Sequence, residues 1–234
     1  MTSGKQDILL IQKILRNVPV FKGLTDEYLR RIAEDVRITR FEKDDTVFHQ
    51  SDESRDLYIV LSGRVRASLI NEEGDELILT VFNVGDFFGE ISLLDGVARS
   101  ATIITEEQST LGMLTRESFL SIARNNPMFL IDVLAIVAKR LRETDTMVGS
   151  LVFFDVTERL VKFLIKLARA EGVRDKDGFY RLRHRIHRDL AARIGASRVA
   201  ITKSLKILAF KKIVKEKKGY FIIYPPSDKN IKIS

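Results

Sequence analysis

The strongest constraint on the fold is a series of short apolar runs between residues 41 and 114, separated by glycine turns. Residues 57–61 form one run, Ser62-Gly63 a turn, and residues 64–70 the returning run. A second turn around Gly74 leads into residues 77–82. Short strands at this spacing are typical of a small antiparallel barrel or sandwich. The sequence therefore predicts such a β unit here.

Helical spacing flanks this β unit on both sides. Residues 7–37 are predicted to be helical, with Thr25 as an N-cap, and residues 129–154 are predicted to form one long helix. Apolar residues of the long helix step by four and three along one seam, broken only by a threonine: Leu130, Leu134, Val137, Leu141, Thr144, Val148 and Leu151. Such a heptad seam favours a coiled-coil homodimer. The alternative is packing of this helix on the chain's own barrel.

Charge divides the chain into two parts of opposite sign. The whole chain carries 39 basic and 32 acidic residues, a net charge of +7. Residues 155–234 hold 21 of the basic and only 8 of the acidic residues, a net charge of +13. This asymmetry predicts a second module with a polyanion as its partner.

Domain boundaries follow from these patterns. A possible capping box, Asp155 with Glu158, begins a new helix where the basic part starts. We expect an α+β protein with an N-terminal antiparallel β-barrel, a long dimerisation helix and a C-terminal basic module. The predicted segments are residues 1–126, 127–154 and 155–234.

Composition excludes several classes of protein. The chain has no cysteine, which excludes disulfides, thiolate-bound zinc and iron–sulfur clusters. No apolar run reaches the roughly 18 residues of a membrane span, and the N-terminus lacks a signal-peptide pattern. We expect a soluble, cytoplasmic protein with no membrane partner.

Residues 88–102 carry the most specific chemistry. Gly89 lets the backbone approach a ligand closely, and a helical turn over residues 90–94 would present free N–H groups to an anion. Arg99 and Ser100 can both bind a phosphate. The ionised carboxylate of Glu90 can only accept hydrogen bonds, so it suits a sugar hydroxyl. Together they fit a ribose phosphate. The alternative is a structural Glu90–Arg99 ion pair on the rim of the barrel.

This segment resembles the phosphate-binding cassette of cyclic nucleotide-binding domains at nearly every position. Residues 58–66, with their Ser-Gly turn, are similar to the barrel of the same family. The chain from about residue 10 to 225 resembles the Crp/Fnr family of bacterial transcription regulators. The resemblance implies that Glu90 holds the ribose 2′-hydroxyl, that Arg99 and Ser100 hold the cyclic phosphate, and that Gly89 gives backbone contacts.

The resemblance also implies a base contact from the long helix. Adjacent Thr and Ser residues contact adenine in members that depend on cyclic AMP, and the matching residues here are Thr144 and Asp145. Asp145 departs from the family and can accept from either adenine or guanine. Arg140 matches a further position near the ligand. Cyclic AMP is thus the expected effector, with cyclic GMP as the alternative.

Residues 187–205 have the pattern of a helix–turn–helix. Ala191 is small enough for two helices to cross, Gly195 makes the turn and Ser197 is an N-cap. Residues 213–214 and 220–224 flank a basic turn and predict a closing hairpin, so the module matches a winged helix. The residues expected to contact DNA are Ser197, Arg198, Val199, Thr202, Lys203, Lys206, Lys217 and Lys218.

Other functions find less support in the sequence. The three histidines, His49, His184 and His187, lie outside the cassette, and the last two fit a solvated or structural role better than a metal site. We therefore expect no metal, haem or iron–sulfur cluster. No nucleophile elbow or P-loop indicates an enzyme.

The expected function is a homodimeric regulator that binds double-stranded DNA, with RNA polymerase as a further partner. One alternative is a regulator of the same family that senses another small molecule. A second is a cyclic nucleotide-binding module that controls a partner protein.

Overall fold

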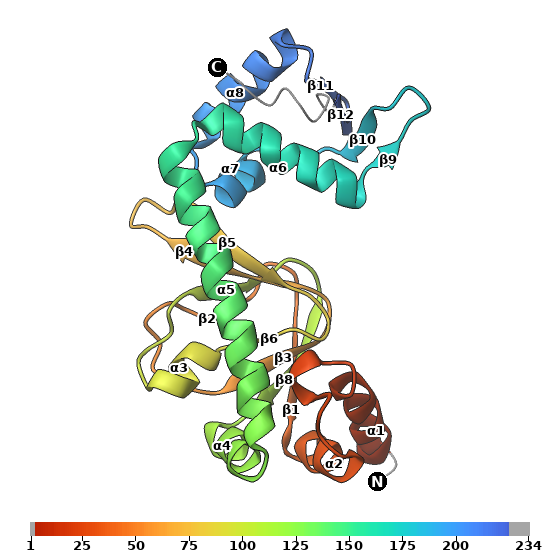
Figure 1. Cartoon of the computed structure of the whole chain (residues 1–234), viewed down its shortest axis with the longest axis vertical. Helices are drawn as coiled ribbons and strands as arrows, with labels where there is room; N and C mark the ends of the chain where they lie inside the picture. Colours follow the sequence, from red (N-terminus) through yellow and green to blue (C-terminus); the bar gives the residue numbers. More distant parts are fainter. Residues whose placement is uncertain (1–2, 225–234) are drawn as a thin grey trace. The chain divides into compact units, whose positions relative to one another are not determined.

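The computed structural model describes residues 3–224, which form two compact units (Figure 1). The N-terminal unit combines the chain up to Leu69 with Leu79–Glu143. The C-terminal unit combines Ile70–Ile78 with the chain from Thr144 onwards. The long helix α5 (Pro127–Phe153) begins in the first unit and ends in the second.

The N-terminal helical region is divided in two. Helix α1 (Ser3–Leu15) is followed by the 3₁₀ turn η1 (Pro19–Phe21), and α2 (Asp26–Asp35) begins after the N-cap Thr25, whose hydroxyl accepts from the N–H of Tyr28. The prediction of helix throughout residues 7–37 was therefore wrong in its extent. Pro19 cannot donate a helical hydrogen bond, so α1 ends before it.

Two four-stranded antiparallel sheets build the N-terminal β unit, as the sequence predicts. The first has the order β1-β8-β3-β6 and the second the order β2-β7-β4-β5. The strands are β1 (Arg37–Phe41), β2 (Thr46–Phe48), β3 (Leu57–Ser62), β4 (Val65–Ile70), β5 (Glu76–Phe82), β6 (Phe87–Phe88), β7 (Thr102–Thr105) and β8 (Ser109–Leu114). Buried residues from both sheets share one core, including Val60, Ala67, Phe88 and Leu111.

Helices close the N-terminal unit against the first sheet. Short α3 (Glu90–Asp95) follows β6, and α4 (Arg116–Asn125) follows β8. Phe129 and Val133 of α5 are buried with α1, α2 and α4 residues in a second core. Among the described residues no single helix is long and apolar enough to cross a membrane; α4 and α5 meet such a criterion only as a pair bent by 117°.

The seam of α5 is divided between two environments. Leu130 and Val137 pack against the core of the N-terminal unit. Leu134, Leu141 and Val148 remain 56%, 62% and 53% exposed. Thr144 of the same seam is exposed as well, so in the single chain the first part of the seam is covered only at Leu130 and Val137.

The C-terminal unit is a three-helix module with a four-stranded sheet. Its elements are α6 (Val156–Glu171), β9 (Val173–Arg174), β10 (Tyr180–Arg183), α7 (His187–Ile194), α8 (Arg198–Phe210), β11 (Val214–Lys217) and β12 (Tyr220–Ile223). The sheet order is β11-β12-β10-β9. The capping box of Asp155 and Glu158 and the closing hairpin are confirmed. Strands β9 and β10 were not predicted.

Candidate functional site

Gly89 begins the segment to which the sequence assigns ligand binding. Its φ of 85° lies in the left-handed region, and α3 starts at the next residue. A Cβ atom added to Gly89 would lie 2.6 Å from Nη1 of Arg99 and 2.8 Å from the carbonyl oxygen of Asp56. Only glycine therefore allows Arg99 to pack against the backbone here.

Arg99 is buried, with 2% of its surface exposed. Its Nε donates to Oγ of Ser54 at 3.0 Å. Its Nη1 donates to the carbonyl oxygen of Gly89 at 3.0 Å, and its Nη2 to that of Asp56 at 2.9 Å. A guanidinium has five N–H groups, so one on each of Nη1 and Nη2 is left for a further acceptor.

Aromatic rings surround the guanidinium of Arg99. Its central carbon lies 4.1 Å from the ring centroid of Phe48 and 5.8 Å from that of Tyr58, in cation–π contact. Burial lowers the pKa of Arg99, while Tyr58 and nearby carboxylates such as Asp56 oppose that shift. Burial also raises the pKa of Tyr58. Arginine remains charged at neutral pH, so the N-terminal unit holds a fixed cation where solvent screens little.

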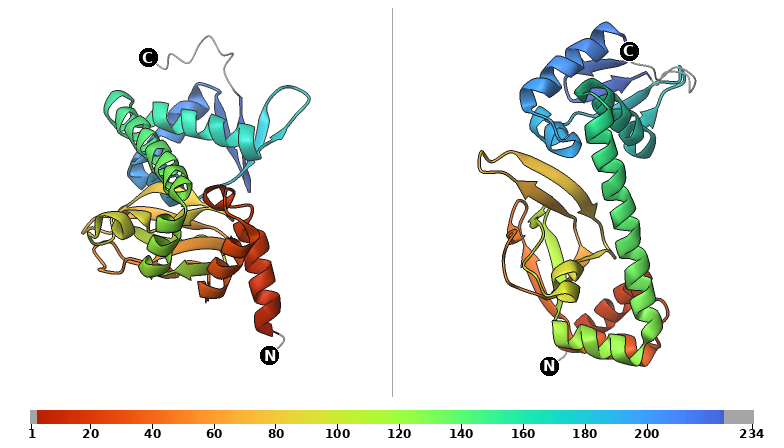
Figure 2. Two further views of the ribbon diagram at one scale, coloured as in Figure 1. Left: turned by 60° about the horizontal axis from the view of Figure 1, so that its bottom comes forward. Right: turned by 60° about the vertical axis from the view of Figure 1, so that its left-hand side comes forward.

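Glu90 is also buried, at 3% exposure, and it pairs with α5 rather than with Arg99. Its Oε1 accepts from Nη1 of Arg140 at 2.7 Å. Nη2 of Arg140 donates to the carbonyl oxygen of Phe87 at 2.6 Å, so Arg140 bridges α3 and β6. Helix α3 therefore lies beside α5, as both views in Figure 2 show. The alternative of a structural Glu90–Arg99 ion pair is not what the structure contains.

The remaining predicted ligand residues are solvent-facing. Ser100 directly follows Arg99 and is exposed. Thr144 lies one helical turn beyond Arg140 on α5, next to Asp145, and both are exposed. Direct contacts thus join Gly89 to Arg99 and Glu90 to Arg140.

The predicted helix–turn–helix is present. Gly195 ends α7 with a φ of 63°, and the N–H of Ala200 donates to Oγ of the N-cap Ser197 at 3.2 Å. Ile201 and Leu208 are fully buried on the inner face of α8. This fixes which side chains of α8 face outward.

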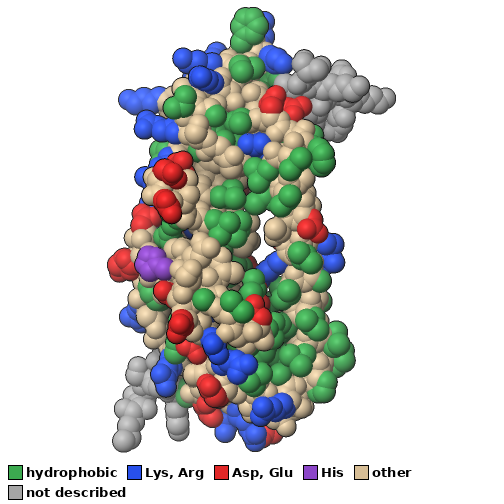
Figure 3. Space-filling view, turned by 90° about the vertical axis from the view of Figure 1, so that its left-hand side faces the viewer, with side chains coloured by type: hydrophobic (Ala, Val, Ile, Leu, Met, Phe, Trp, Pro, Cys, Tyr) green, Lys and Arg blue, Asp and Glu red, His purple; other side chains and the backbone are tan. Residues whose placement is uncertain are grey.

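Most residues predicted to contact DNA lie on that outer face. Exposed members are Ser197, Arg198, Val199, Lys203, Lys206, Lys217 and Lys218. Thr202 differs because it is half-buried. Its Oγ1 lies 2.9 Å from Nδ1 of His187 and donates to the carbonyl oxygen of Arg198 at 3.1 Å. Lysine and arginine side chains are also visible on the upper part of Figure 3, which belongs to the C-terminal unit.

Arg159 is a connecting residue that sequence reasoning missed. Its Nη1 donates to the carbonyl oxygen of Phe154 at 2.9 Å, just beyond the end of α5. Its Nη2 donates to the carbonyl oxygen of Gly195 at 3.0 Å, in the turn of the helix–turn–helix. These residues all belong to the C-terminal unit, so Arg159 fixes the end of α5 to that turn.

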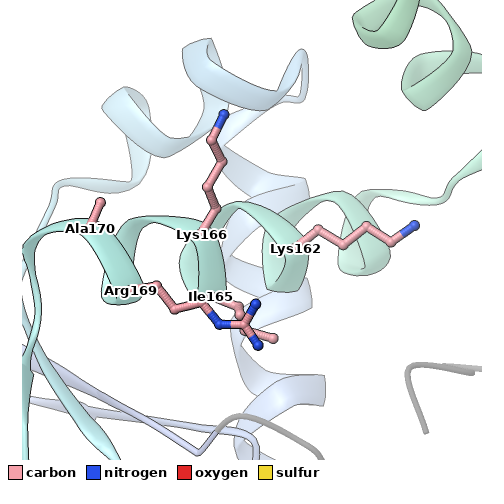
Figure 4. A pocket seen from close by; sticks show the side chains of 5 residues that line it. All are labelled: Lys162, Ile165, Lys166, Arg169 and Ala170. Carbon is pink, nitrogen blue, oxygen red and sulfur yellow. The ribbon is translucent and has the colours of Figure 1, made fainter. Parts of the chain in front are cut away.

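A shallow hollow on α6 contains none of the predicted site residues. Its lining is basic at Lys162, Lys166 and Arg169 and apolar at Ile165 and Ala170. Figure 4 shows Lys162 and Lys166 extending from the helix in different directions. Their divergence makes convergent binding of one small anion at this hollow unfavourable.

Comparisons with known proteins agree with this geometry. Residues 38–126 match the family model of the cyclic nucleotide-binding domain. The chain is 32% identical over 201 residues to the cyclic AMP receptor protein of Thermus thermophilus, covering 86% of this chain and 90% of that protein. The chain belongs to the Crp/Fnr family.

Other members of the Crp/Fnr family are similar over most of their length. A CRP-like cAMP-activated global transcriptional regulator of Mycobacterium tuberculosis is 30% identical over 83% of this chain and 87% of its own. The c-di-GMP-responsive regulator CLP of Xanthomonas campestris shares the fold, with a TM-score of 0.76 at 24% identity, over 86% of this chain and all of that one. The relatives are transcription regulators, so this Crp/Fnr member is a regulator rather than an enzyme.

Proposed function

We propose that this protein binds cyclic AMP in its N-terminal unit and, as a homodimer, a palindromic DNA operator through its C-terminal unit. The observation that carries the proposal is the pairing of Arg99 with Gly89 and of Glu90 with Arg140, within a chain that also contains a helix–turn–helix. The relatives named for cyclic AMP support the choice of effector.

Each group of the nucleotide has a matching donor or acceptor. The two remaining N–H groups of Arg99 and the exposed hydroxyl of Ser100 bind the cyclic phosphate. The second carboxylate oxygen of Glu90 accepts from the ribose 2′-hydroxyl, while Arg140 holds the first. A backbone cradle at Gly89 completes this part of the site.

The base is recognised from α5, through Thr144 and Asp145. A carboxylate at position 145 accepts from the amino group of adenine or from the N–H edge of guanine. Asp145→Ser restores the Thr-Ser pair expected of cyclic AMP-dependent members. We therefore expect this variant to raise the ratio of cyclic AMP to cyclic GMP affinity.

Calorimetric titration with cyclic AMP, cyclic GMP and cyclic di-GMP tests the effector. We expect one cyclic AMP per chain and tighter binding of cyclic AMP than of the other two. Tighter binding of cyclic di-GMP would place this protein with regulators that sense another effector, and binding of none of the three would refute the nucleotide site.

Dimerisation is proposed from the uncovered row of α5. Leu134, Leu141 and Val148 are separated by seven residues and are all more than half exposed. A second copy of α5 offers the same row, so two such helices can pack against each other along it. The proposed segments are residues 1–126 for the nucleotide domain, 127–154 for dimerisation and 155–234 for DNA.

Two recognition helices in such a dimer predict operator half-sites about one helical turn apart, ~34–36 Å. Arg198, Val199, Lys203 and Lys206 are the exposed residues of α8 for the groove. Lys217 and Lys218 of the wing contact phosphate. RNA polymerase is the proposed further partner, and the cytoplasm the proposed location.

A gel-shift assay with DNA selected from a random pool separates the main alternatives. Cyclic AMP should increase DNA affinity, since the effector must favour one of two dimer arrangements to act as a switch. A protein that binds cyclic AMP but no DNA at any nucleotide concentration would instead be a module that controls a partner protein. The exposed basic face of α8 argues against that outcome.

A further inference from the structure

Two imidazoles and a carboxylate meet in the C-terminal unit, apart from any residue assigned above to the nucleotide. His184 follows β10, His187 begins α7, and Glu216 lies in β11. Their potential ligand atoms all lie within 4.8 Å of one another. In the sequence His184 and His187 are three residues apart, but no pattern points to Glu216. The sequence analysis therefore favoured a solvated or structural role for the two histidines.

We propose that His184, His187 and Glu216 form a binding site for a divalent transition-metal ion, with Zn²⁺ as the best match. Two histidines and one carboxylate are an established ligand set for zinc, which leaves the fourth position to water. This proposal goes beyond the regulator function and does not depend on nucleotide or DNA binding.

The distances between the three ligands fit such an ion. Nε2 of His184 lies 2.7 Å from Oε1 of Glu216, and Nε2 of His187 lies 3.7 Å from the same oxygen. Ligands at about 2.0–2.2 Å in a tetrahedron are separated by about 3.3–3.6 Å. The observed separations lie on either side of this range. To reach this range, Nε2 of His184 and Oε1 of Glu216 must move apart by about 0.6–0.9 Å, which their partly exposed side chains can accommodate.

Neighbouring groups already orient both rings. Nδ1 of His187 is 2.9 Å from Oγ1 of Thr202, an oxygen partner of the kind that fixes a metal-binding histidine with Nε2 toward the ion. The ring of His184 stacks on Phe221 at a centroid distance of 4.7 Å. The backbone N–H of His184 also donates to the carbonyl oxygen of Gly219 at 3.0 Å. Little ordering remains to be done when the ion binds.

Access and charge bear on how tightly the ion is held. The side chains of His184, His187 and Glu216 are 30%, 23% and 46% exposed, so an ion can reach them from solvent. Lys217 and Lys218 line the same hollow as His184 and Glu216. Their positive charges oppose a dication, and the carboxylate of Glu216 offsets part of that repulsion.

A bound ion would join the short segment between β10 and α7, which holds both histidines, to strand β11, about thirty residues further along the chain. Because the folded C-terminal unit presents the three ligands together and the unfolded chain does not, binding stabilises the fold. Thermal stability is thus a second readout beside binding itself.

The test uses the full-length protein without an affinity tag, titrated calorimetrically with ZnCl₂ in a buffer that does not bind zinc. We expect one Zn²⁺ per chain, a rise in the melting temperature with Zn²⁺, and visible absorption bands of tetrahedral Co²⁺ when Co²⁺ replaces it. Glu216→Gln and His187→Gln should each weaken Zn²⁺ binding by more than about tenfold. His49→Gln, an exposed histidine of the N-terminal unit, is the matched control and should bind as the wild type does.

Circular dichroism without metal checks that each variant folds, and the exposure of Glu216 makes Glu216→Gln the safer of the two. If wild-type protein shows no binding, or if both variants bind Zn²⁺ as the wild type does, the cluster is only an ion pair and the proposal is wrong. Equal loss in His49→Gln would also overturn it, because the binding would then be nonspecific.

Discussion

Arg99→Ala should reduce both the stability of the N-terminal unit and its affinity for cyclic AMP. Alanine removes the donor to the carbonyl oxygen of Asp56 and one of two donors to that of Gly89, which still accepts from the N–H of Leu93 at 3.4 Å. A buried acceptor that loses its partner costs about 1–3 kcal/mol, so the two together cost at most about 2–6 kcal/mol. Asp56 is only half-buried and water can reach it, so we expect about 2–4 kcal/mol. For a chain of this size that lowers the melting temperature by roughly 5–15 °C.

Circular dichroism during heating, without nucleotide, measures this loss of stability. Arg55→Ala is the matched control, because Arg55 is an exposed arginine between Ser54 and Asp56, the two loop residues that Arg99 contacts, and it should melt with the wild type. Arg99→Lys keeps the charge but not the planar set of donors, so its melting temperature should lie between those of the wild type and Arg99→Ala. An unchanged melting temperature for Arg99→Ala would refute the claim that the buried guanidinium and its hydrogen bonds stabilise the N-terminal unit.

Calorimetry on the same proteins separates stability from binding. At a temperature where Arg99→Ala is folded, it should bind cyclic AMP at least tenfold more weakly, because each charged hydrogen bond to phosphate contributes about 1.5–3 kcal/mol. Wild-type affinity in a destabilised but folded variant would show that Arg99 supports the cassette without touching the phosphate.

The remaining predictions concern α5 and the DNA-binding unit. Leu134→Glu combined with Leu141→Glu should give monomers in sedimentation, because buried like charges would face their symmetry mates; a monomeric wild type would contradict the coiled coil. Thr144→Ala should leave the dimer intact and weaken cyclic AMP binding in calorimetry. In selection from random DNA, Val199→Glu should gain a preference for cytosine beside the guanine contacted by the preceding arginine, worth about 1–3 kcal/mol; no change would refute a base contact there. Arg159→Met should keep cyclic AMP affinity but reduce the gain in DNA affinity that cyclic AMP produces, as gel shifts would show.

Features specified by neighbouring residues were predictable from the sequence. Gly195 and Ser197 mark the turn and the next helix start within three positions, and the Asp155–Glu158 capping box spans four. These signals depend on backbone dihedrals and on hydrogen bonds within one turn. The error in residues 7–37 came from weighing apolar spacing above Pro19, which ends the helical pattern.

Contacts between distant residues could not be predicted in this way. Arg99 reaches Ser54 and Asp56, and Glu90 reaches Arg140 fifty residues away. No local pattern relates such residues, because strand order and helix packing bring them together. The cassette residues were identified from their chemistry, but the partners that orient Arg99 and Glu90 required the structure.

The seam of α5 shows why the sequence could not decide between the two interpretations of its heptad. Positions seven apart lie on nearly the same side of a helix, drifting by only about 20° per heptad. Leu130 and Val137 form one row and pack on the chain's own core, whereas the row of Leu134 and Leu141 stays exposed. A sequence period cannot assign the rows to different surfaces, because both are equally apolar. Thr144 continues the row of Leu130 and Val137 by its spacing, although its own side chain is exposed. Its spacing therefore puts Thr144 outside the row of Leu134 and Leu141, so the heptad alone gives it no role in setting the register of a dimer along that row.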